Sequence, residues 1–462
     1  MDDDAFQRKQ SLKVIISEFV MVIAVIITVC ALAFIVSGYW LNSDFKIEQN
    51  GMLQISSTPS GADLSIDGES SWLRRTNTSK ILSSGEHNIV LTKEGYDSWS
   101  KTINIAEGLL YRINYPRLFL QERNIEKVHN VTPYTYAAAS PDRTRLLLAG
   151  DTSEWNIIDL RHEKLQDKKI NIHGVLSGMQ ATTQIGLFTG EIISTQWSND
   201  NERILSKIAS GDKFEWILID INNADNSINL STAFKKDFLN VKLINRNEAL
   251  AIYDNNLYKL DFRNSSISES LASNVYAFEY FGNEIFYSAL SPDSKYYIGS
   301  IGLDGAQSDM VLYTEQPALI GVFKFYDELF IATVEDKELK LFKKDDRTNP
   351  VITSTLEFIP QSIKSGQDGE FVIAYNGPTI ATLDMEANSV KVWQVDGENF
   401  GWVDNYMPYS VADGELYVYD FDGINKRLLA KNVSSRFPAL VTENKWLYYV
   451  SDGTLIREQI VR

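Results

Sequence analysis

Residues 125–462 are built from a unit that recurs eight times, about every 40 residues. Each unit contains a strand, a turn centred on Asp or Asn, a second strand rich in apolar and aromatic residues, another turn and a third strand. The first-turn residues are Asp142, Asp200, Asn247, Asn283, Asp327, Asp368, Asn405 and Asn444. A small sheet cannot bury both of its faces alone, whereas a closed ring of such sheets does. This period predicts a β-propeller of seven or eight blades in residues 121–462.

The last unit is one strand short of a four-stranded blade. Its strands at 446–450 and 454–459 are followed by only three more residues. Residues 122–131, which precede the first unit, can supply the missing strand. We therefore expect the start and the end of this region to pair and close the ring.

Residues 19–36 form an apolar run in which only Thr28 is even weakly polar. With its flanks, a helix through this run covers the roughly 30 Å hydrocarbon core of a bilayer. A cleaved signal peptide is the alternative, but its apolar region usually has only about 7 to 15 residues. We expect residues 14–40 to be an uncleaved transmembrane helix, so that the protein is a single-pass membrane protein.

The charges that flank the apolar run predict its orientation. Arg8, Lys9 and Lys13 precede it, and only Lys46 follows closely. Because cytoplasmic flanks carry the excess of Lys and Arg, the N-terminus is expected in the cytoplasm. The β-domains that follow are then extracytoplasmic, in the cell envelope.

The composition argues against several classes of function. The chain has 44 Lys and Arg against 61 Asp and Glu, a net charge of −17, so no nucleic-acid partner is expected. The single cysteine, Cys30, lies inside the apolar run and leaves no disulfide or thiolate metal site. The four histidines, His87, His129, His162 and His173, share no metal-ligand spacing. We expect no metal and no cofactor.

Residues 52–120 read as short alternating strands bounded by Gly, Pro, Ser or Asp, the pattern of a small antiparallel sandwich. The residues expected on its inner faces are Ile55, Leu64, Ile66, Ile89, Leu91, Ile103 and Ile105.

Three ordered motifs in this stretch resemble the PEGA domain family. Residues 53–68 read LQISSTPSGADLSIDG, residues 82–87 read LSSGEH and residues 93–96 read KEGY. The matching positions, which set turns and carry no catalytic chemistry, are Pro59, Gly61, Ala62, Asp67, Gly68, Gly85, Gly95 and Tyr96. The sequence departs from the family at Ser60, where the family has glutamate, and at 72–77. The resemblance implies a small β-module of bacterial and archaeal surface proteins, commonly placed beside a membrane span, that mediates contacts.

Two turns also resemble the Ser-Pro-Asp steps of propellers like the periplasmic one of the bacterial Tol system. They lie at 140–142 and 291–293, and residues 197–200 form a looser copy. The longest gap between first-turn residues separates Asp142 from Asp200. It predicts that residues 161–190 are an insertion in the propeller.

No linear motif identifies a reaction. Residues 420–423, Asp-Phe-Asp-Gly, lack the later acidic ligands of a calcium loop. The chain also has no nucleophile elbow, phosphate-binding glycine loop or zinc-binding helix motif. We therefore name no catalytic residue.

Aromatic and arginine side chains are the remaining candidates for binding, because Trp, Tyr and Arg are favoured at interfaces. One group lies in a loop of residues 52–120 and the other within residues 400–409. The candidates are Trp72, Arg74, Arg75, Trp402, Tyr406 and Tyr409. Packing in the β-domains is the alternative interpretation for both groups.

The sequence thus predicts a mainly β protein with a cytoplasmic tail (1–13), a transmembrane helix (14–40), a linker (41–51), a PEGA-like sandwich (52–120) and a propeller (121–462). We expect a membrane-anchored, non-enzymatic envelope protein whose β-domains bind protein or glycan. A propeller enzyme acting on envelope glycans or another extracellular substrate is one alternative, and its acids would have to converge at a mouth of the central channel. A transmembrane sensor is the other.

Overall fold

The computed structural model describes residues 3–36, 39–41, 47–150, 152–162, 164–176, 190–210, 213–306, 308–346, 348–366, 369–397 and 399–462. The chain divides into two compact units, Met1–Phe119 and Leu120–Arg462. Each unit is described by itself below.

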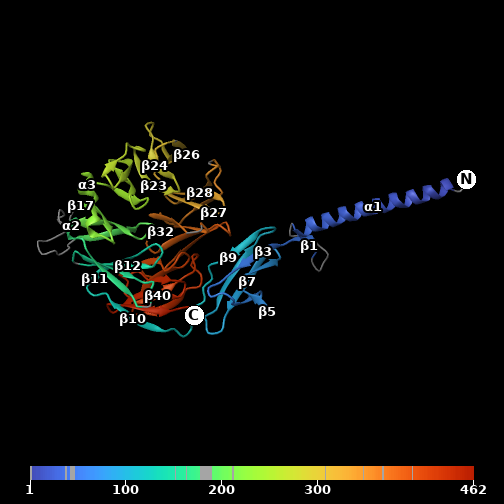
Figure 1. The fold of residues 1–462 in the computed structure, drawn as a ribbon, viewed down its shortest axis with the longest axis horizontal. Helices are drawn as coiled ribbons and strands as arrows, with labels where there is room; N and C mark the ends of the chain where they lie inside the picture. The colour runs from blue at the N-terminus through green and yellow to red at the C-terminus, as the bar shows by residue number, and fades with distance from the viewer. Residues whose placement is uncertain are drawn as a thin grey trace. The chain divides into compact units, whose positions relative to one another are not determined.

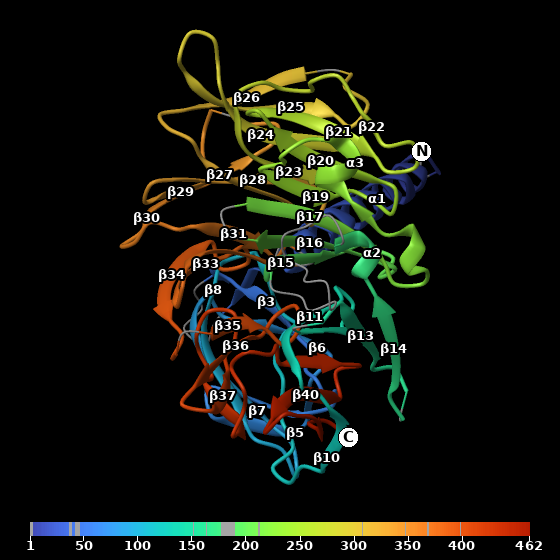
Figure 2. The ribbon, with the colours of Figure 1, turned by 90° about the vertical axis from the view of Figure 1, so that its left-hand side faces the viewer.

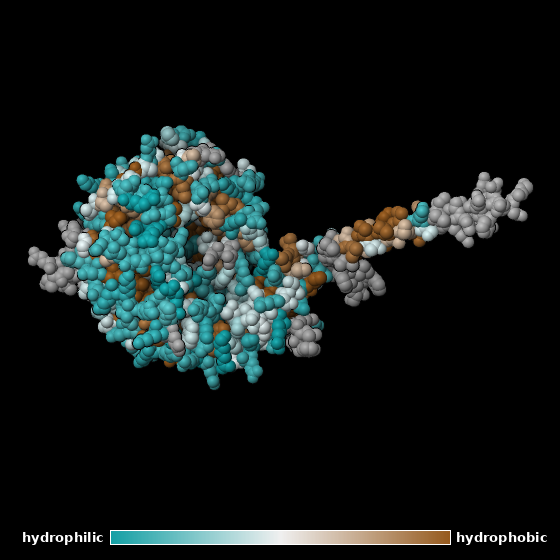
Figure 3. All heavy atoms as spheres, in the orientation of Figure 1, coloured by the Kyte–Doolittle hydropathy of each residue, from teal (hydrophilic) through white to brown (hydrophobic). Residues whose placement is uncertain are grey.

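The first unit begins with the helix α1, Asp3–Val36. Its window Ser17–Phe34 is long and apolar enough to cross a membrane, and the side chains of this window are almost all exposed. Figure 3 shows the apolar residues gathered along α1. A signal sequence near the N-terminus passes the same test of length and composition.

The helix and the linker differ from their expected bounds. The helix ends at Val36, and the strands β1 (Tyr39–Leu41) and β2 (Ile47–Gln49) form a small antiparallel sheet. Two residues expected in the helix, Tyr39 and Trp40, therefore lie in a strand. The expected polar linker, residues 41–51, contains the strand β2 of this sheet.

The rest of the first unit contains two further sheets. The strands, in chain order, are β3 (Gly51–Ile55), β4 (Asp63–Ile66), β5 (Glu69–Arg75), β6 (Thr78–Leu82), β7 (Gly85–Thr92), β8 (Trp99–Ile105) and β9 (Leu110–Ile113). One sheet has the order β6-β3-β9 and the other the order β5-β4-β7-β8. Buried and exposed residues alternate along β3 and β8, as expected for strands with one face in a core. All seven residues expected on the inner faces are buried.

The PEGA motif residues form turns, as their residue types predict. Asp67 and Gly68 both have positive φ, 53° and 81°, and connect β4 to β5 in a tight hairpin. The Asp67 side chain also reaches across the sheet, where its Oδ2 lies 2.7 Å from His87 Nδ1 and its Oδ1 accepts a hydrogen bond from the amide of Asn88. The histidine of the LSSGEH motif therefore holds the Asp-Gly turn in place.

The described part of the second unit contains eight antiparallel sheets of four strands each. The first four are β11 (Tyr134–Ala139), β12 (Arg145–Gly150), β13 (Glu154–Asp159) and β14 (Gln166–Asn171); β15 (Glu191–Trp197), β16 (Arg203–Ser210), β17 (Lys213–Asp220) and β18 (Ile228–Asn229); β19 (Asn240–Leu243), β20 (Glu248–Tyr253), β21 (Asn256–Asp261) and β22 (Ser266–Ile267); and β23 (Val275–Phe281), β24 (Glu284–Leu290), β25 (Tyr296–Gly302) and β26 (Ser308–Thr314).

The other four sheets follow the same pattern. They are β27 (Leu319–Phe325), β28 (Glu328–Glu335), β29 (Glu338–Lys343) and β30 (Ile352–Thr355); β31 (Ser362–Ser365), β32 (Phe371–Asn376), β33 (Thr379–Asp384) and β34 (Ser389–Gln394); β35 (Asn399–Trp402), β36 (Pro408–Ala412), β37 (Glu415–Val418) and β38 (Arg427–Lys431); and β39 (Leu440–Thr442), β40 (Trp446–Ser451), β41 (Thr454–Gln459) and β10 (Ile125–Asn130). The short helices α2 (His173–Leu176), η1 (Ala224–Asn226) and α3 (Leu230–Phe234) connect strands.

These sheets form the blades of a β-propeller. In Figure 1 the colour runs around a ring from green through yellow and orange to red, and the last strands return to β10 and β11. Figure 2 shows neighbouring sheets stacked on one another. The first strands of successive sheets adjoin, as β15 does β19 and β27 does β31. Apolar side chains of neighbouring blades interdigitate between the sheets, for example Leu147 and Trp155 with Ile204 and Ile217.

The ring closes as the sequence predicts. Strand β10 pairs antiparallel with β41, so the start of the unit supplies the outer strand of the last blade. Two ion pairs reinforce this pairing: Arg123 Nη1 lies 2.8 Å from Glu458 Oε1, and Arg457 is bound to Glu126. The last and first blades also share an apolar core, in which Leu440 and Tyr448 pack with Leu146 and Ile158. Closure therefore combines a strand ladder, ion pairs and apolar packing.

The first-turn residues also lie where the repeat predicts. Seven of the eight are in the turn between the first and second strands of a blade, and Asp368 lies outside the described residues. In the first blade the Ser140 hydroxyl donates to Asp142 Oδ1 at 2.6 Å and accepts from the amide of Arg145 at 3.0 Å. The Ser-x-Asp sequence closes the turn by these two bonds.

The expected insertion at 161–190 is partly wrong. Residues 166–171 are the outer strand β14, which pairs with β13 along its whole length. This strand is exposed at four of its first five positions, so it lacks the apolar alternation that reveals a strand in sequence. Residues 177–189 lie outside the described residues.

Candidate functional site

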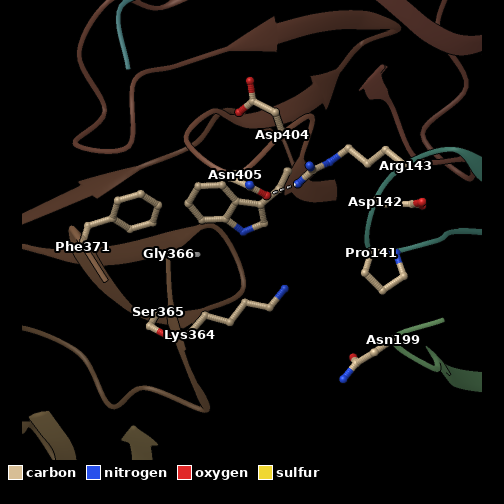
Figure 4. Close-up of a pocket in the computed structure, with 11 residues that line it drawn as sticks. Pro141, Asp142, Arg143, Asn199, Lys364, Ser365, Gly366, Phe371, Asp404 and Asn405 are labelled. Carbon is tan, nitrogen blue, oxygen red and sulfur yellow. Dashed lines mark hydrogen bonds between the residues drawn. The ribbon is translucent and has the colours of Figure 1, made fainter. Parts of the chain in front are cut away.

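A cavity of about 600 Å³ lies where first turns of the propeller converge, and we call it the mouth cavity. Four blades contribute to it, through the β11–β12, β15–β16, β31–β32 and β35–β36 turns. The lining residues are Pro141, Asp142, Arg143, Asn199, Lys364, Ser365, Gly366, Phe371, Trp402, Asp404 and Asn405, most of which are drawn and labelled in Figure 4. Turns from opposite arcs of the ring therefore face one space.

A second cavity of about 1070 Å³ neighbours the first, and Asn199 lines both. Its other walls include Asn245, Tyr280 and Asn283, from the β19–β20 and β23–β24 turns. The two cavities thus occupy the end of the ring at which the first turns lie. This end is the candidate binding face of the propeller.

Two cations extend into the mouth cavity. Lys364 comes from β31, and Arg143 comes from the β11–β12 turn on the other side of the cavity (Figure 4). The Arg143 Nη2 donates a 2.8 Å hydrogen bond to Asn405 Oδ1, which fixes the guanidinium. Burial lowers the pKa of the Lys364 amine, and the positive charge of Arg143 lowers it further. The site brings two like charges together.

Two carboxylates, Asp142 and Asp404, line the same cavity but are engaged in their own turns. Asp404 Oδ1 accepts from the amides of Tyr406 at 2.8 Å and Met407 at 2.7 Å. Burial raises the pKa of Asp142, but hydrogen bonds from the flanking Ser and Thr outweigh this effect and hold the pKa below its ordinary value. Both acids therefore act chiefly as hydrogen-bond acceptors that shape the turns.

An aromatic stack forms part of the cavity wall. Trp402 lies parallel to Phe371, with centroids 5.5 Å apart and planes at 11°, and Phe371 in turn stacks on Phe421 at 4.9 Å. Trp402 is half-buried, so the stack fixes an indole that still reaches the cavity. A fixed aromatic face is a low-entropy contact surface for a ligand.

The other predicted aromatics of residues 400–409 lie differently. Tyr406 is half-buried and packs edge-on against Phe371. Tyr409 is only 7% exposed and burial raises its pKa, so it is part of the propeller core. Of the three candidates in this segment, the structure brings only Trp402 to the mouth cavity.

The candidates in the first unit form a strand and not a loop. Trp72, Arg74 and Arg75 belong to β5, and the side chains of Trp72 and Arg74 lie outside the described part of the structure. Arg75 is exposed and its Nε lies 3.4 Å from Asp63 Oδ1. This pair neighbours no cavity that we describe.

Sequence reasoning missed Lys364 and Arg143, because neither belongs to a linear motif. A usable signal existed, since Arg143 directly follows the turn residue Asp142 and its partner Asn405 is itself a first-turn residue. Residues beside the first-turn positions of different blades are the ones that meet at the mouth.

Among the described residues, no three His, Cys, Asp or Glu side chains gather in a group that could hold a metal ion. The convergence required of a propeller enzyme is met only in part. Two carboxylates reach the mouth cavity, but both are committed to their turns, and no histidine is among the lining residues.

Comparisons with known proteins give a family for one segment. Residues 50–117 match the PEGA domain model, as the motifs predicted. No curated protein sequence matches the chain.

Solved structures that resemble the chain are propellers of diverse function. The β-propeller domain of Cps50 (Swd1) from Myceliophteria thermophila is similar over 74% of this chain and 100% of that chain, with 12% identity and a TM-score of 0.41. Dihydro-heme d1 dehydrogenase NirN in complex with DHE is similar over 64% of this chain and 66% of that chain, with 12% identity and a TM-score of 0.42. Oligogalacturonate lyase in complex with manganese is similar over 58% and 89%, with 13% identity and a TM-score of 0.38. Likenesses at this level concern the fold and carry nothing about a ligand.

Proposed function

We propose that this protein is a membrane-anchored binding protein of the cell envelope. In this proposal α1 crosses the cytoplasmic membrane with its N-terminus inside. The PEGA domain and the propeller lie outside, and the propeller binds an envelope protein or glycan.

The mouth cavity is the observation that carries the proposal. Ligand sites in proteins are typically concave, about 300 to 1,000 Å³, with an apolar wall and a few convergent polar groups. The mouth cavity has about this volume and combines the indole of Trp402 with Lys364, Arg143 and Asn405. Its acids are satisfied by their own turns, which favours binding over acid–base catalysis.

Site-specific photo-crosslinking in cells tests the proposal. A photoreactive phenylalanine analogue replaces Ser365, which is exposed and lines the mouth cavity. The matched control replaces Ser266, an exposed serine of the outer strand β22 that lines neither cavity. We expect light-dependent adducts of the full-length protein at position 365 and none at position 266.

The adducts also report the kind of partner. An adduct whose peptides include those of a second protein, read by mass spectrometry, indicates a protein, and one that is shifted by glycan hydrolases indicates a glycan. Equal adducts at both positions, or none at position 365, would contradict a binding function for the mouth cavity.

A further inference from the structure

The amine of Lys364 has no partner of opposite charge among the described residues. Within the described part of the chain it makes no hydrogen bond and no ion pair, and the only neighbouring charge that perturbs it is that of Arg143. Other lysines near the first turns are paired, as Lys242 is with Glu279 at 2.7 Å and Lys324 with Asp327 at 3.1 Å. An ammonium beside a guanidinium repels it, so a ligand that supplies negative charge is favoured there.

The surroundings of Lys364 strengthen the attraction between its charge and an anion. Solvent reaches its side chain, but the walls of the cavity surround it, and this partial desolvation weakens the screening of its charge by water. Asp142 and Asp404 line the cavity too, and each accepts hydrogen bonds from its own turn. In Figure 4 the Asp404 carboxylate points away from the Lys364 amine.

The fold positions Arg143 at the cavity. Its backbone adopts a left-handed conformation, with φ of 58°, which non-glycine residues rarely adopt. Its guanidinium is anchored through Asn405 from another blade, so the two cations approach the cavity from opposite sides. A guanidinium and an ammonium together suit an oxyanion, because the first binds it in a fork and the second acts as a point charge.

The aromatic wall favours one kind of ligand among those that carry an anionic group. Trp402 presents a flat apolar face, held in place by its stack on Phe371 and Phe421. A sugar ring with its C–H groups has a flat apolar face of its own, whereas an extended peptide end does not. The cavity volume suits one or two such rings or the end of a chain.

We propose that the mouth cavity binds an acidic sugar, with Lys364 and Arg143 holding its carboxylate or phosphate group and Trp402 packing against its ring. The inference deepens the proposed function and rests on it. A carboxylate and a phosphate are both oxyanions that Lys and Arg can bind, and separate probes distinguish the two.

Titration calorimetry on the full-length protein in detergent tests this inference. The probes are D-glucuronate, glucose 6-phosphate, neutral D-glucose and N-acetylglycine. We expect saturable binding of D-glucuronate, of glucose 6-phosphate or of both, and much weaker binding of glucose. A loss of charge-assisted hydrogen bonds predicts that Lys364→Gln and Arg143→Gln each weaken binding by about ten-fold or more.

Two variants keep the test specific. Lys391→Gln removes an exposed lysine from β34 of the same blade as Lys364, away from the cavity, and should bind like the wild type. Trp402→Phe keeps an aromatic ring and should weaken binding less than Trp402→Ala. An unchanged melting temperature of Lys364→Gln shows that any loss of affinity is local.

Several results would overturn the inference. Equal affinity for glucose and glucuronate would show that Lys364 and Arg143 do not bind the anionic group. Tighter binding of N-acetylglycine than of either acidic sugar would assign the site to a peptide carboxylate instead. Absence of binding by every probe, together with adducts at position 365, would leave the proposed function standing and remove the acidic-sugar assignment.

Discussion

Removal of Arg123 is the perturbation that best examines how the propeller closes. Arg123 precedes β10 and its Nη1 contacts both Glu458 Oε1 at 2.8 Å and the carbonyl oxygen of Leu429 at 2.7 Å. The Glu458 side chain is only 2% exposed and that of Arg123 is 21% exposed. Arg123→Ala therefore leaves a buried carboxylate without its cation at the junction of β10 and β41.

The magnitude follows from this burial. Removing one partner of a buried ion pair costs about 3 to 5 kcal/mol, and the partial exposure of Arg123 places the cost at about 3 kcal/mol. For a unit of this size that free energy lowers the melting temperature by about 4 °C. Urea denaturation followed by tryptophan fluorescence, together with calorimetry, measures both quantities.

The loss of unfolding free energy in Arg123→Ala should depend on pH. Burial raises the pKa of Glu458 above its ordinary value of 4.5, against the opposing effects of Arg123 and Tyr449. A carboxyl with a raised folded-state pKa stabilises the fold fully below its unfolded pKa and loses that contribution as pH rises through the folded pKa. Without Arg123 the folded pKa rises further. The stability deficit of Arg123→Ala is therefore small near pH 4 and grows as pH rises through the folded pKa of Glu458.

Two variants serve as controls for this prediction. Arg123→Ala with Glu458→Gln removes the unpaired charge and should recover much of the lost stability. Lys431→Ala breaks the exposed pair between Lys431 and Glu415 and should leave the melting temperature unchanged. An Arg123→Ala protein as stable as the wild type at pH 7, or no recovery in the double variant, would refute the role of this pair in closure.

Three further predictions concern the two units. Burial lowers the pKa of His87, but bonds to Asp67 and to the carbonyl of Ser83 outweigh this effect and hold the pKa above 6.5. The raised pKa stabilises the PEGA domain fully below pH 6.5, and this stabilisation is lost as pH rises through the folded pKa. An NMR titration of the imidazole measures the pKa. Gly401→Ala places a Cβ 2.6 Å from the Tyr409 ring and should cost about 1 to 3 kcal/mol in a denaturation experiment. Tyr409→Ala should cost about 3 kcal/mol or more because the ring is buried, and clearly more than Trp402→Ala in the same assay.

Much of the fold was readable because it is repetitive. Asp or Asn at each first turn and the apolar second strand recur in every blade, and the missing last strand pointed to β10. The outer strands were harder, since β14 is mostly polar and pairs along one edge only. Alternation along β3 and β8 likewise identified the sandwich core.

The candidate site was less predictable for a physical reason. Its groups lie far apart in sequence and meet only because a ring brings turns of opposite arcs to one mouth. Arg143 and Asn405 are 262 residues apart, yet they share a hydrogen bond. Local composition did mark the segment around Trp402, but it could not separate the cavity-lining Trp402 from the buried Tyr409.

Cysteine labelling tests the central claim of a membrane-anchored protein with an accessible extracytoplasmic mouth. Both variants carry Cys30→Ser, so that each contains a single cysteine. One variant has Ser365→Cys at the mouth cavity, and the other has Ser11→Cys in the tail. A membrane-impermeant maleimide is added to spheroplasts before and after lysis. The account predicts labelling at position 365 in intact spheroplasts and at position 11 only after lysis. Labelling at position 365 only after lysis would contradict it.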